Sequence, residues 1–445
     1  MEAQLLILDF GSQVTQLIAR NARELGVYCE ILPGNLPASD ILAKRPKAII
    51  LSGGPASVNE PGAPKVDQRV LESGLPIFGI CYGMQLLAQC FGGTVTGWGT
   101  KCGASEAREF GPAYVEITNP IGLFGSFAAA QKVKVWMSHG DKVSELPSGF
   151  SVLGTSDNSP VAAFGDPSRS IYGVQFHPEV HHTECGRELI RSFLFDVAGL
   201  KADWDPSNFA DSVIKEISEK VPTGNVVCGL SGGVDSTVAA VLVHKAIGER
   251  LHCIFVDNGL LRADESGEVM RMMGGLGLNV HLVDASERFL SELAGVTDPE
   301  QKRKIIGRVF IEVFEAEASR IEDVEYLVQG TLYPDVIESI SVVGSSATIK
   351  SHHNVGGLID DMKLALIEPL RELFKDEVRA IGRSLGVPEE CIARQPFPGP
   401  GLAVRCLGEC AAQRLEKLRI ADKIVRDEVA KMPGAEEIWQ SFAVL

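Results

Sequence analysis

Continuous apolar runs that end in glycine-marked turns recur through the first 200 residues. Three such runs cover residues 4–11, 47–55 and 75–83. Runs of this kind are typical of strands that are buried on both faces of a parallel sheet. Residues 13–26 carry apolar side chains at helical spacing and close on glycine, which predicts a helix. Residues 114–118 and 171–179 have the pattern of further strands, so this region is expected to be an α/β domain.

A second region with the same alternation follows a polar, turn-rich stretch at residues 198–208. We predict strands over residues 225–230, 251–259 and 279–286, and a helix over residues 237–248. This βαβ rhythm predicts a second parallel sheet with right-handed crossovers.

The last part of the chain is expected to differ from both. Residues 394–405 are rich in proline and glycine, which predicts a loop or hinge, and a charged helix is predicted from residue 413 to about residue 431. We therefore expect three regions, at residues 1–200, 201–393 and 394–445. The fold class that we expect is α/β, with two doubly wound parallel-sheet domains followed by an incomplete C-terminal domain.

Composition and charge narrow the class of protein. Hydrophobic residues make up 45% of the 445 residues and charged residues 22%, which excludes wholesale disorder. The formal net charge of −16 opposes unspecific binding to nucleic acid or to anionic membranes, so any site for a polyanion must be locally basic.

Cysteine spacing and the N-terminus indicate a compartment. The ten cysteines form no CxxC pair, which favours reduced thiols. No apolar run reaches the roughly 18–20 residues of a membrane-spanning helix. The first residues have no basic segment ahead of an apolar one, so we expect no signal peptide and a cytoplasmic protein.

Cys81 lies in the sequence GICYG, directly after an apolar run and before a helical pattern. This is the layout of a nucleophile elbow, a tight strand-to-helix turn, with cysteine in place of serine. Such a turn exposes the sulfur. The helix N-terminus behind it favours the thiolate and offers N–H groups to a developing oxyanion.

His177 and Glu179 stand two residues apart in the sequence HPE, so their side chains should point the same way. A histidine base and a carboxylate that orients it would complete a Cys-His-Glu triad with Cys81. The alternative is that Cys81 is a buried core thiol and His177 a histidine in a surface turn.

Together with LSGGP at residues 51–55, these motifs resemble the class I glutamine amidotransferases, in the same order, over about residues 1–200. The resemblance implies hydrolysis of glutamine through a γ-glutamyl thioester, with release of ammonia. It also implies an oxyanion hole at the backbone of Gly53 and Tyr82, and a role for Gln85 in holding glutamine. His139 falls in a stretch that resembles the lining of this pocket, with a structural loop histidine as the alternative.

The sequence SGGVDS at residues 231–236 lies between a predicted strand and a predicted helix. Small residues in this position let backbone N–H groups close around phosphate. The loop is not a Walker A motif, because the lysine of that motif is missing. A simple turn is the alternative.

This loop resembles that of the PP-loop ATP pyrophosphatases, which split ATP into AMP and pyrophosphate in order to adenylate a carbonyl oxygen. The residues that the resemblance assigns to ATP are Ser231, Gly232, Gly233, Val234, Asp235, Ser236 and Thr237, with Val256 and Leu260 near adenine. It places Asp235 at the Mg²⁺–pyrophosphate end.

Three more segments, residues 302–307, 329–335 and 349–358, supply local positive charge. In them Lys350 is a candidate for pyrophosphate, and Arg303 and Asp335 for the substrate. For any one basic residue, Lys302 and Lys304 included, the alternative is a solvated surface charge. The pairs His352–His353 and His181–His182 have no third ligand at zinc spacing, so we expect no zinc site there.

Both motif sets in one chain, followed by KSHHNVGGL and RQPFPGPGL, resemble the glutamine-hydrolysing GMP synthase family. The resemblance implies that XMP, ATP, glutamine and water give GMP, AMP, pyrophosphate and glutamate, with Mg²⁺. It also implies a homodimer, formed through a C-terminal domain that here has barely begun at Leu445. We therefore expect weak XMP binding and a doubtful dimer.

Three other functions stay open on the sequence. The chain could be another PP-loop amidation or thiolation enzyme, a glutaminase that supplies ammonia to a separate protein, or a non-catalytic nucleotide-binding regulator.

Overall fold

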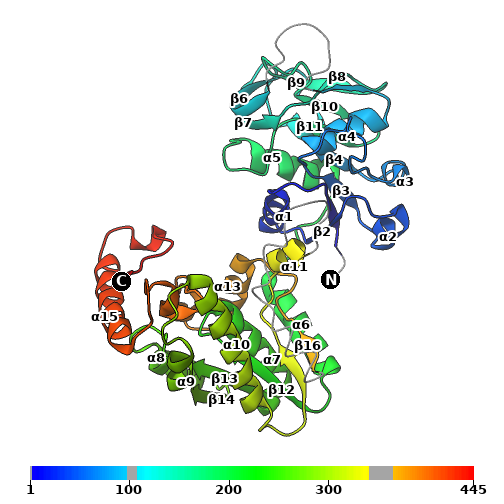
Figure 1. Ribbon diagram of the computed structural model, residues 1–445. Coiled ribbons are helices and arrows are strands. Elements are labelled where there is room, and N and C mark those ends of the chain that lie inside the picture. The colour runs from blue at the N-terminus through cyan, green and yellow to red at the C-terminus, as the bar shows by residue number, and fades with distance from the viewer. Residues whose placement is uncertain (1–2, 98–107, 340–363) are drawn as a thin grey trace. The chain divides into compact units, whose positions relative to one another are not determined.

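The computed structural model describes residues 3–97, 108–339 and 364–445. They form two compact units that divide between Asp205 and Pro206. Each unit is built on its own sheet (Figure 1). The predicted α/β class is confirmed.

Among the described residues of the first unit, nine strands form one mixed sheet in the order β2-β1-β3-β4-β11-β10-β9-β6-β7. Its parallel part consists of β1 (Leu5–Asp9), β2 (Cys29–Pro33), β3 (Ala48–Leu51), β4 (Ile77–Ile80) and β11 (Ile171–Val174). Its antiparallel part consists of β10 (Ala163–Asp166), β9 (Ser151–Thr155), β6 (Glu109–Ile117) and β7 (Lys132–His139). A separate pair is formed by β5 (Thr94–Thr96) and β8 (Lys142–Glu145).

The apolar runs of the sequence form the parallel strands, because a strand in mid-sheet is buried on both faces. Every residue of β3 and of β4 is buried. The helices are α1 (Thr15–Glu24), α2 (Ala38–Ala43), α3 (Gln68–Leu71), α4 (Tyr82–Cys90) and α5 (Gly186–Arg191), followed by the π-helix η2 (Ser192–Val197). The helix α4 packs against β4 and β11, the strands that carry the candidate triad.

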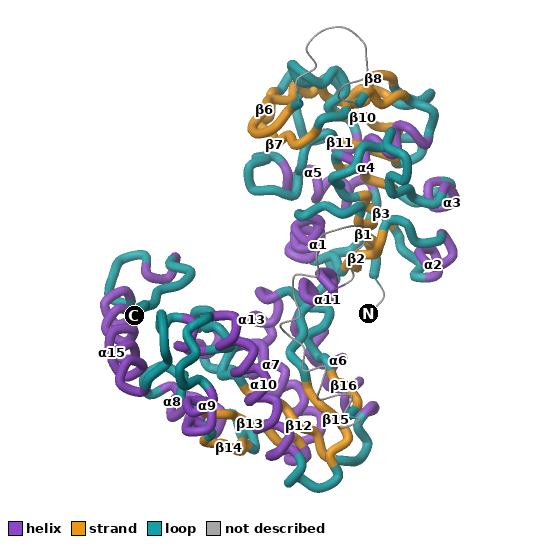
Figure 2. The backbone as a smooth tube through the Cα atoms, in the orientation of Figure 1, coloured by secondary structure: helices purple, strands orange, loops and turns teal. Residues whose placement is uncertain are grey.

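The second unit has a fully parallel sheet in the order β14-β13-β12-β15-β16 across its described residues. The strands are β12 (Asn225–Leu230), β13 (Leu251–Asp257), β14 (Val280–Asp284), β15 (Val324–Val328) and β16 (Ala365–Ile367). Figure 2 shows these strands flanked by helices. Chain order reverses between β12 and β15, and ligands of open α/β sheets bind at such a switch point, beyond the carboxyl ends of the strands.

The helices of this unit are α6 (Pro206–Lys220), α7 (Val234–Ile247), α8 (Glu265–Gly275), α9 (Ser286–Glu292), α10 (Pro299–Ala318), α11 (Tyr333–Ser339), α13 (Lys375–Ser384), α14 (Glu389–Ile392) and α15 (Ala412–Val429). The helices α6, α7 and α13 pack on one another. The helix α10 packs on the sheet through Phe314, in one core cluster with Val227 and Ile254. No helix in the described part of the chain is long and apolar enough to cross a bilayer.

Residues 394–445 belong to the second unit. Leu402, Cys406 and Leu415 are buried in the same cluster as Phe314. Lys302 of α10 is also buried, and its ammonium donates to the carbonyl oxygens of Ala403, Cys406 and Gly408. A solvated surface charge is therefore wrong for Lys302. Its neighbour Lys304 is exposed.

Candidate active sites

Cys81 joins β4 to α4 in a strained backbone conformation. Its φ is 51° and its ψ is −104°, values that residues with a Cβ atom rarely adopt. The Cys81 N–H donates to Val174 O at 2.8 Å, which ties the turn to β11. This is the nucleophile elbow that the sequence predicts.

Two glycines allow the turn to be this tight. A Cβ atom on Gly83 would lie 2.4 Å from Leu51 O, and one on Gly79 would lie 2.7 Å from the Gly83 carbonyl oxygen. Neither gap can hold a methyl group, so only glycine lets α4 start this close to β3 and β4.

His177 is held between Cys81 and Glu179. Its Nδ1 lies 2.8 Å from Glu179 Oε1, and all three side chains are buried. Burial by itself lowers the pKa of His177, but its hydrogen bonds to Cys81 and Glu179 and their charges outweigh burial and raise this pKa to about 10. The structure therefore brings the three predicted residues together, with an imidazole that can exchange a proton with the thiol.

The backbone around His177 fixes its position. Its N–H donates to Trp136 O at 3.0 Å, and its carbonyl accepts from Thr183 Oγ1 at 2.6 Å. Glu179 O accepts from Asn21 Nδ2 at 3.1 Å. Glu179 Oε2 is buried and has no hydrogen-bond partner among the described residues.

Gly53 and Tyr82 both adjoin Cys81. A Cβ atom on Gly53 would lie 3.1 Å from His177 Cε1 and 3.7 Å from Cys81 Cβ, so the Gly53 backbone passes against the triad. Tyr82 is the first residue of α4, where an N–H has no partner within the helix. Both backbones can therefore face an oxyanion that forms beside Cys81.

Gln85 and His139 are both buried, and both contact the carbonyl oxygen of Asp141. The Gln85 amide donates to Asp141 O at 2.8 Å. His139 Nδ1 lies 3.0 Å from Asp141 O, and its Nε2 lies 3.2 Å from Glu109 Oε2. The ring nitrogens of His139 are thus directed to partners outside the triad, which favours the structural alternative for this residue.

Sequence reasoning missed Gln175. Its Nε2 donates to Cys81 Sγ at 3.7 Å, and its Oε1 accepts from Gln85 Nε2 at 3.2 Å. Gln175 is fully buried. Its place directly after β11, two residues before His177, could have indicated it.

The SGGVDS loop of the second unit follows β12 and leads into α7, at the sheet's switch point. Its hydroxyls bond to one another, with Ser231 Oγ 3.0 Å from Ser236 Oγ. The N–H groups of Ser231 and Gly233 donate to these hydroxyls at 3.2 and 3.4 Å. Gly232 has a φ of +70°, which favours glycine at that turn.

Val234 and Thr237 turn away from the loop surface and are buried. Thr237 Oγ1 donates to Gly233 O at 2.8 Å, so this hydroxyl is engaged in the first turn of α7. Val256 and Leu260, expected near adenine, are buried in the apolar core of the unit.

Asp235 is the acidic residue of the first turn of α7. Its Oδ2 lies 3.3 Å from Lys375 Nζ, whereas its Oδ1 is buried without a hydrogen-bond partner in the described part of the chain. A second cation near the loop is Arg394, whose Nη1 donates to Gly232 O at 2.8 Å. Neither Lys375 nor Arg394 has a local sequence signal that connects it to this loop.

Arg303 and Asp335 lie on different helices. Arg303, near the start of α10, pairs with Glu300 at 3.5 Å. Asp335, in the first turn of α11, accepts from the Leu332 N–H at 3.2 Å. Lys350 lies outside the described residues, as do His352 and His353.

No three His, Cys, Asp or Glu side chains gather as metal ligands within the described residues. The His181 and His182 rings lie 6.1 Å apart, and His182 packs on Trp136 at 4.5 Å between ring centroids.

Comparison with known proteins matches each unit to a family. The family described as glutamine amidotransferase class-I matches residues 6–197, and the family described as NAD synthase matches residues 207–305.

Relatives described as GMP synthase (glutamine-hydrolyzing) match the chain across both units. The one from Oleidesulfovibrio alaskensis is 55% identical and covers 100% of this chain and 86% of its own length. The one from Nitratidesulfovibrio vulgaris is 56% identical over the same shares. A relative from Rhizobium etli is 54% identical over 99% of this chain and 84% of its own length. The chain belongs to the glutamine-hydrolysing GMP synthase family.

Proposed function

We propose that this protein makes GMP from XMP, with nitrogen from glutamine and activation by ATP. The observation that carries the proposal is the union, in one chain, of a Cys81–His177–Glu179 triad and an SGGVDS loop. A relative described as GMP synthase (glutamine-hydrolyzing) is 55% identical over the whole chain.

In the first unit, the Cys81 thiolate attacks the side-chain amide carbon of glutamine. His177 takes the proton of the Cys81 thiol and gives it to the leaving nitrogen, so the C–N bond breaks and ammonia departs. The N–H groups of Gly53 and Tyr82 stabilise the oxyanion, and Gln85 and Gln175 shape the pocket. Water then hydrolyses the thioester to glutamate and restores the thiol.

In the second unit, the XMP C2 oxygen attacks the α-phosphorus of ATP and pyrophosphate leaves. Ammonia then displaces AMP at C2 to give GMP. The SGGVDS loop and the N-terminus of α7 hold the phosphates, with Ser231, Gly232, Gly233 and Ser236 at the loop surface. Lys350, Arg303 and Asp335 are proposed to act on pyrophosphate and XMP. Val256 and Leu260 are proposed to lie near adenine, because they stand at the carboxyl end of β13 and just beyond it.

The family uses ATP, and we propose that Mg²⁺ binds with it. Asp235 is a suitable ligand for Mg²⁺, because its buried Oδ1 lacks a hydrogen-bond partner in the described residues and carboxylate oxygen is a preferred Mg²⁺ ligand. When bound, the ion would neutralise charge on pyrophosphate as it leaves.

We also propose, from the family resemblance, a cytoplasmic location, no binding to nucleic acid or membranes, and a homodimer for the full-length family member. A light-scattering mass of the purified chain tests the dimer, and cell fractionation tests the location.

ATP–pyrophosphate exchange that depends on XMP, together with GMP formation from external ammonia, tests the proposed function. Exchange that requires XMP is the expected result. Glutamine hydrolysis without any XMP-dependent exchange would instead identify a glutaminase that supplies ammonia elsewhere.

A further inference from the structure

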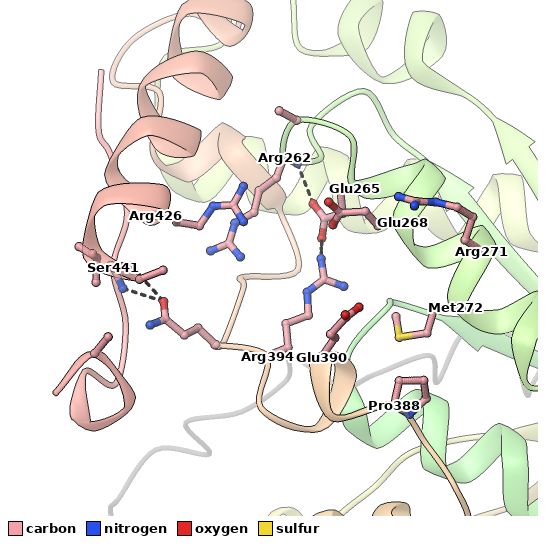
Figure 3. Close-up of a pocket in the computed structure, with 15 residues that line it drawn as sticks. Arg262, Glu265, Glu268, Arg271, Met272, Pro388, Glu390, Arg394, Arg426 and Ser441 are labelled. Atoms are coloured by element: carbon pink, nitrogen blue, oxygen red, sulfur yellow. Dashed lines mark hydrogen bonds and ion pairs between the residues drawn. The ribbon is translucent and has the colours of Figure 1, made fainter. Parts of the chain in front are cut away.

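A pocket of about 800 Å³ lies in the second unit between α8, α15 and the segment that contains Arg394. Figure 3 shows Arg262 and Arg426 reaching into it from different elements, with Arg394 on a third. A volume of this size is typical of small-molecule sites. Neither the triad nor the SGGVDS loop lines it.

Three arginines next to this pocket share one buried carboxylate, that of Asp422. The pairs are Arg262 Nε–Oδ2 at 3.4 Å, Arg405 Nη1–Oδ1 at 3.5 Å and Arg426 Nε–Oδ2 at 3.0 Å. Asp422 is fully buried. One carboxylate cannot neutralise three guanidinium groups, so the cluster keeps an excess of two positive charges.

Arg262 is the arginine of this cluster whose charge is least compensated by hydrogen bonds. Only 6% of it is exposed, and neither its Nε nor its Nη2 has a hydrogen-bond partner within the described residues. Burial lowers the pKa of Arg262 to about 10, so it is still a cation at neutral pH. Its guanidinium lies over the Phe397 ring, 4.4 Å from the centroid. This contact stabilises the cation but supplies no hydrogen-bond acceptor to Nε or Nη2.

Acidic residues near the pocket do not remove the excess. Glu265 is committed to Arg394, with which it forms an ion pair, and to the Arg262 backbone N–H at 2.7 Å. Glu268 and Glu390 also line the pocket, but both are exposed, where water and salt screen their charge. The buried wall of the pocket is therefore cationic.

We propose that this pocket binds a phosphate dianion, with the guanidinium groups of Arg262 and Arg426 as its donors. Two excess charges match a dianion, and guanidinium N–H groups pair with phosphate oxygens two at a time. The phosphate can be inorganic phosphate or the monophosphate end of a nucleotide. The binding itself rests on the geometry of the second unit and does not require the proposed function.

The pocket adjoins the candidate ATP site through Arg394. That side chain pairs with Glu265 on the pocket side and donates to Gly232 O of the SGGVDS loop at 2.8 Å. Arg394 would thus stand between a phosphate bound at Arg262 and Arg426 and the SGGVDS loop.

Inorganic phosphate titrated into the full chain tests the proposal, with chloride at matched ionic strength as the reference. Calorimetry should show saturable binding. Arg426→Gln, on a half-buried side chain, should weaken it at least about tenfold, an effect typical of losing a charge-assisted hydrogen bond. Lys423→Gln makes the same charge change on the same helix but leaves the pocket unchanged, so phosphate binding should stay as in the unaltered protein.

Arg262→Gln serves as a second variant, and circular dichroism checks that each variant folds. No saturable phosphate binding by the unaltered protein, or equal losses in Arg426→Gln and Lys423→Gln, would overturn the proposal. If the three arginines and Asp422 serve only to anchor α15, the unaltered protein shows no saturable phosphate binding. Where binding is found, competition by XMP assigns the site to a nucleotide monophosphate, and independent binding of XMP assigns it to free phosphate.

Discussion

In the first unit, Cys81, His177 and Glu179 are buried and joined by hydrogen bonds through His177, whereas the SGGVDS loop of the second unit bonds mainly to itself. The difference follows from the chemistry. A covalent nucleophile must be activated by neighbours that are already in place. A phosphate site instead presents N–H groups and charges whose partners are the ligand's own oxygens. The His177–Glu179 hydrogen bond therefore identifies the first site, whereas Asp235 Oδ1, which has no hydrogen-bond partner among the described residues, points to a ligand in the second.

The sharpest separation of the two units is expected from Cys81→Ala. Glutamine-dependent GMP formation should fall by at least about 10⁴-fold, the order seen when a covalent nucleophile is removed. Ammonia-dependent formation should stay within about twofold, because external ammonia bypasses the thioester. Both rates are measured on the same preparation. Cys90→Ala, on the same helix, should leave both rates unchanged, and equal loss of both rates in Cys81→Ala would mean that Cys81 is structural.

Asp235→Asn should produce the opposite pattern. We expect XMP-dependent ATP–pyrophosphate exchange to fall by about a hundredfold or more, because a group that faces phosphate and metal charge is lost. Glutamine hydrolysis should persist, since the triad lies in the other unit. Asp427→Asn on α15 is the control. Normal exchange by Asp235→Asn would refute the role of this loop.

Gly83→Ala tests whether the first site depends on the tight turn. The added methyl group would meet Leu51 O at 2.4 Å, so α4 must shift. We expect a loss of about 2–3 kcal/mol in the free energy of unfolding, a usual cost of overpacking, together with a slower glutaminase. Gly125→Ala, whose nearest neighbour would be 3.4 Å away, should cost little. Similar denaturation midpoints for the two variants would contradict the packing argument.

Lys302→Met tests the attachment of the C-terminal segment in the second unit. Three carbonyl oxygens would lose their donor, and we expect a cost of about 2 kcal/mol for burying them unbonded. Hydrogen exchange at residues 403–410 should speed up, while glutamine hydrolysis stays unchanged. Lys304→Met changes an exposed neighbour and should show no such effect. Unchanged exchange in Lys302→Met would mean that apolar packing alone holds the segment.

The smallest effect concerns pH. Because the folded protein raises the pKa of His177 to about 10, the protonated ring stabilises the fold below about pH 6.5, and this contribution is lost as pH rises toward 10. In Glu179→Gln the pKa should fall, since one source of the shift is gone. An NMR titration of the His177 ring measures this shift. The unfolding of the first unit should also depend less on pH between 7 and 10. An unmoved pKa would exclude Glu179 as a cause.

The sequence determined the parts of both sites that are local in the chain. A strand, a glycine-bounded turn and a helix place Cys81, and the same three pieces place residues 231–236, because each needs only near neighbours and backbone geometry. The HPE motif also brings His177 and Glu179 together, but in the turn after β11, which ends at Val174, and not through the alternation of a strand. The strand over residues 225–230 was predicted to its ends for a similar reason, because a continuous apolar run marks a buried parallel strand.

Only the tertiary structure decided which distant residues complete these sites. Gln175 meets Cys81 across 94 residues of chain, and Lys375 meets Asp235 across 140. Lys302 reads in the sequence as one of several basic residues, but folding buries it against carbonyl oxygens more than 100 residues away. Asp422 likewise becomes the shared partner of three arginines only when α15 packs on the unit. Sequence patterns indicate which face of a helix or strand a side chain lies on. The pairing of polar groups depends instead on which elements the sheet order brings together, and that order is a property of the whole fold.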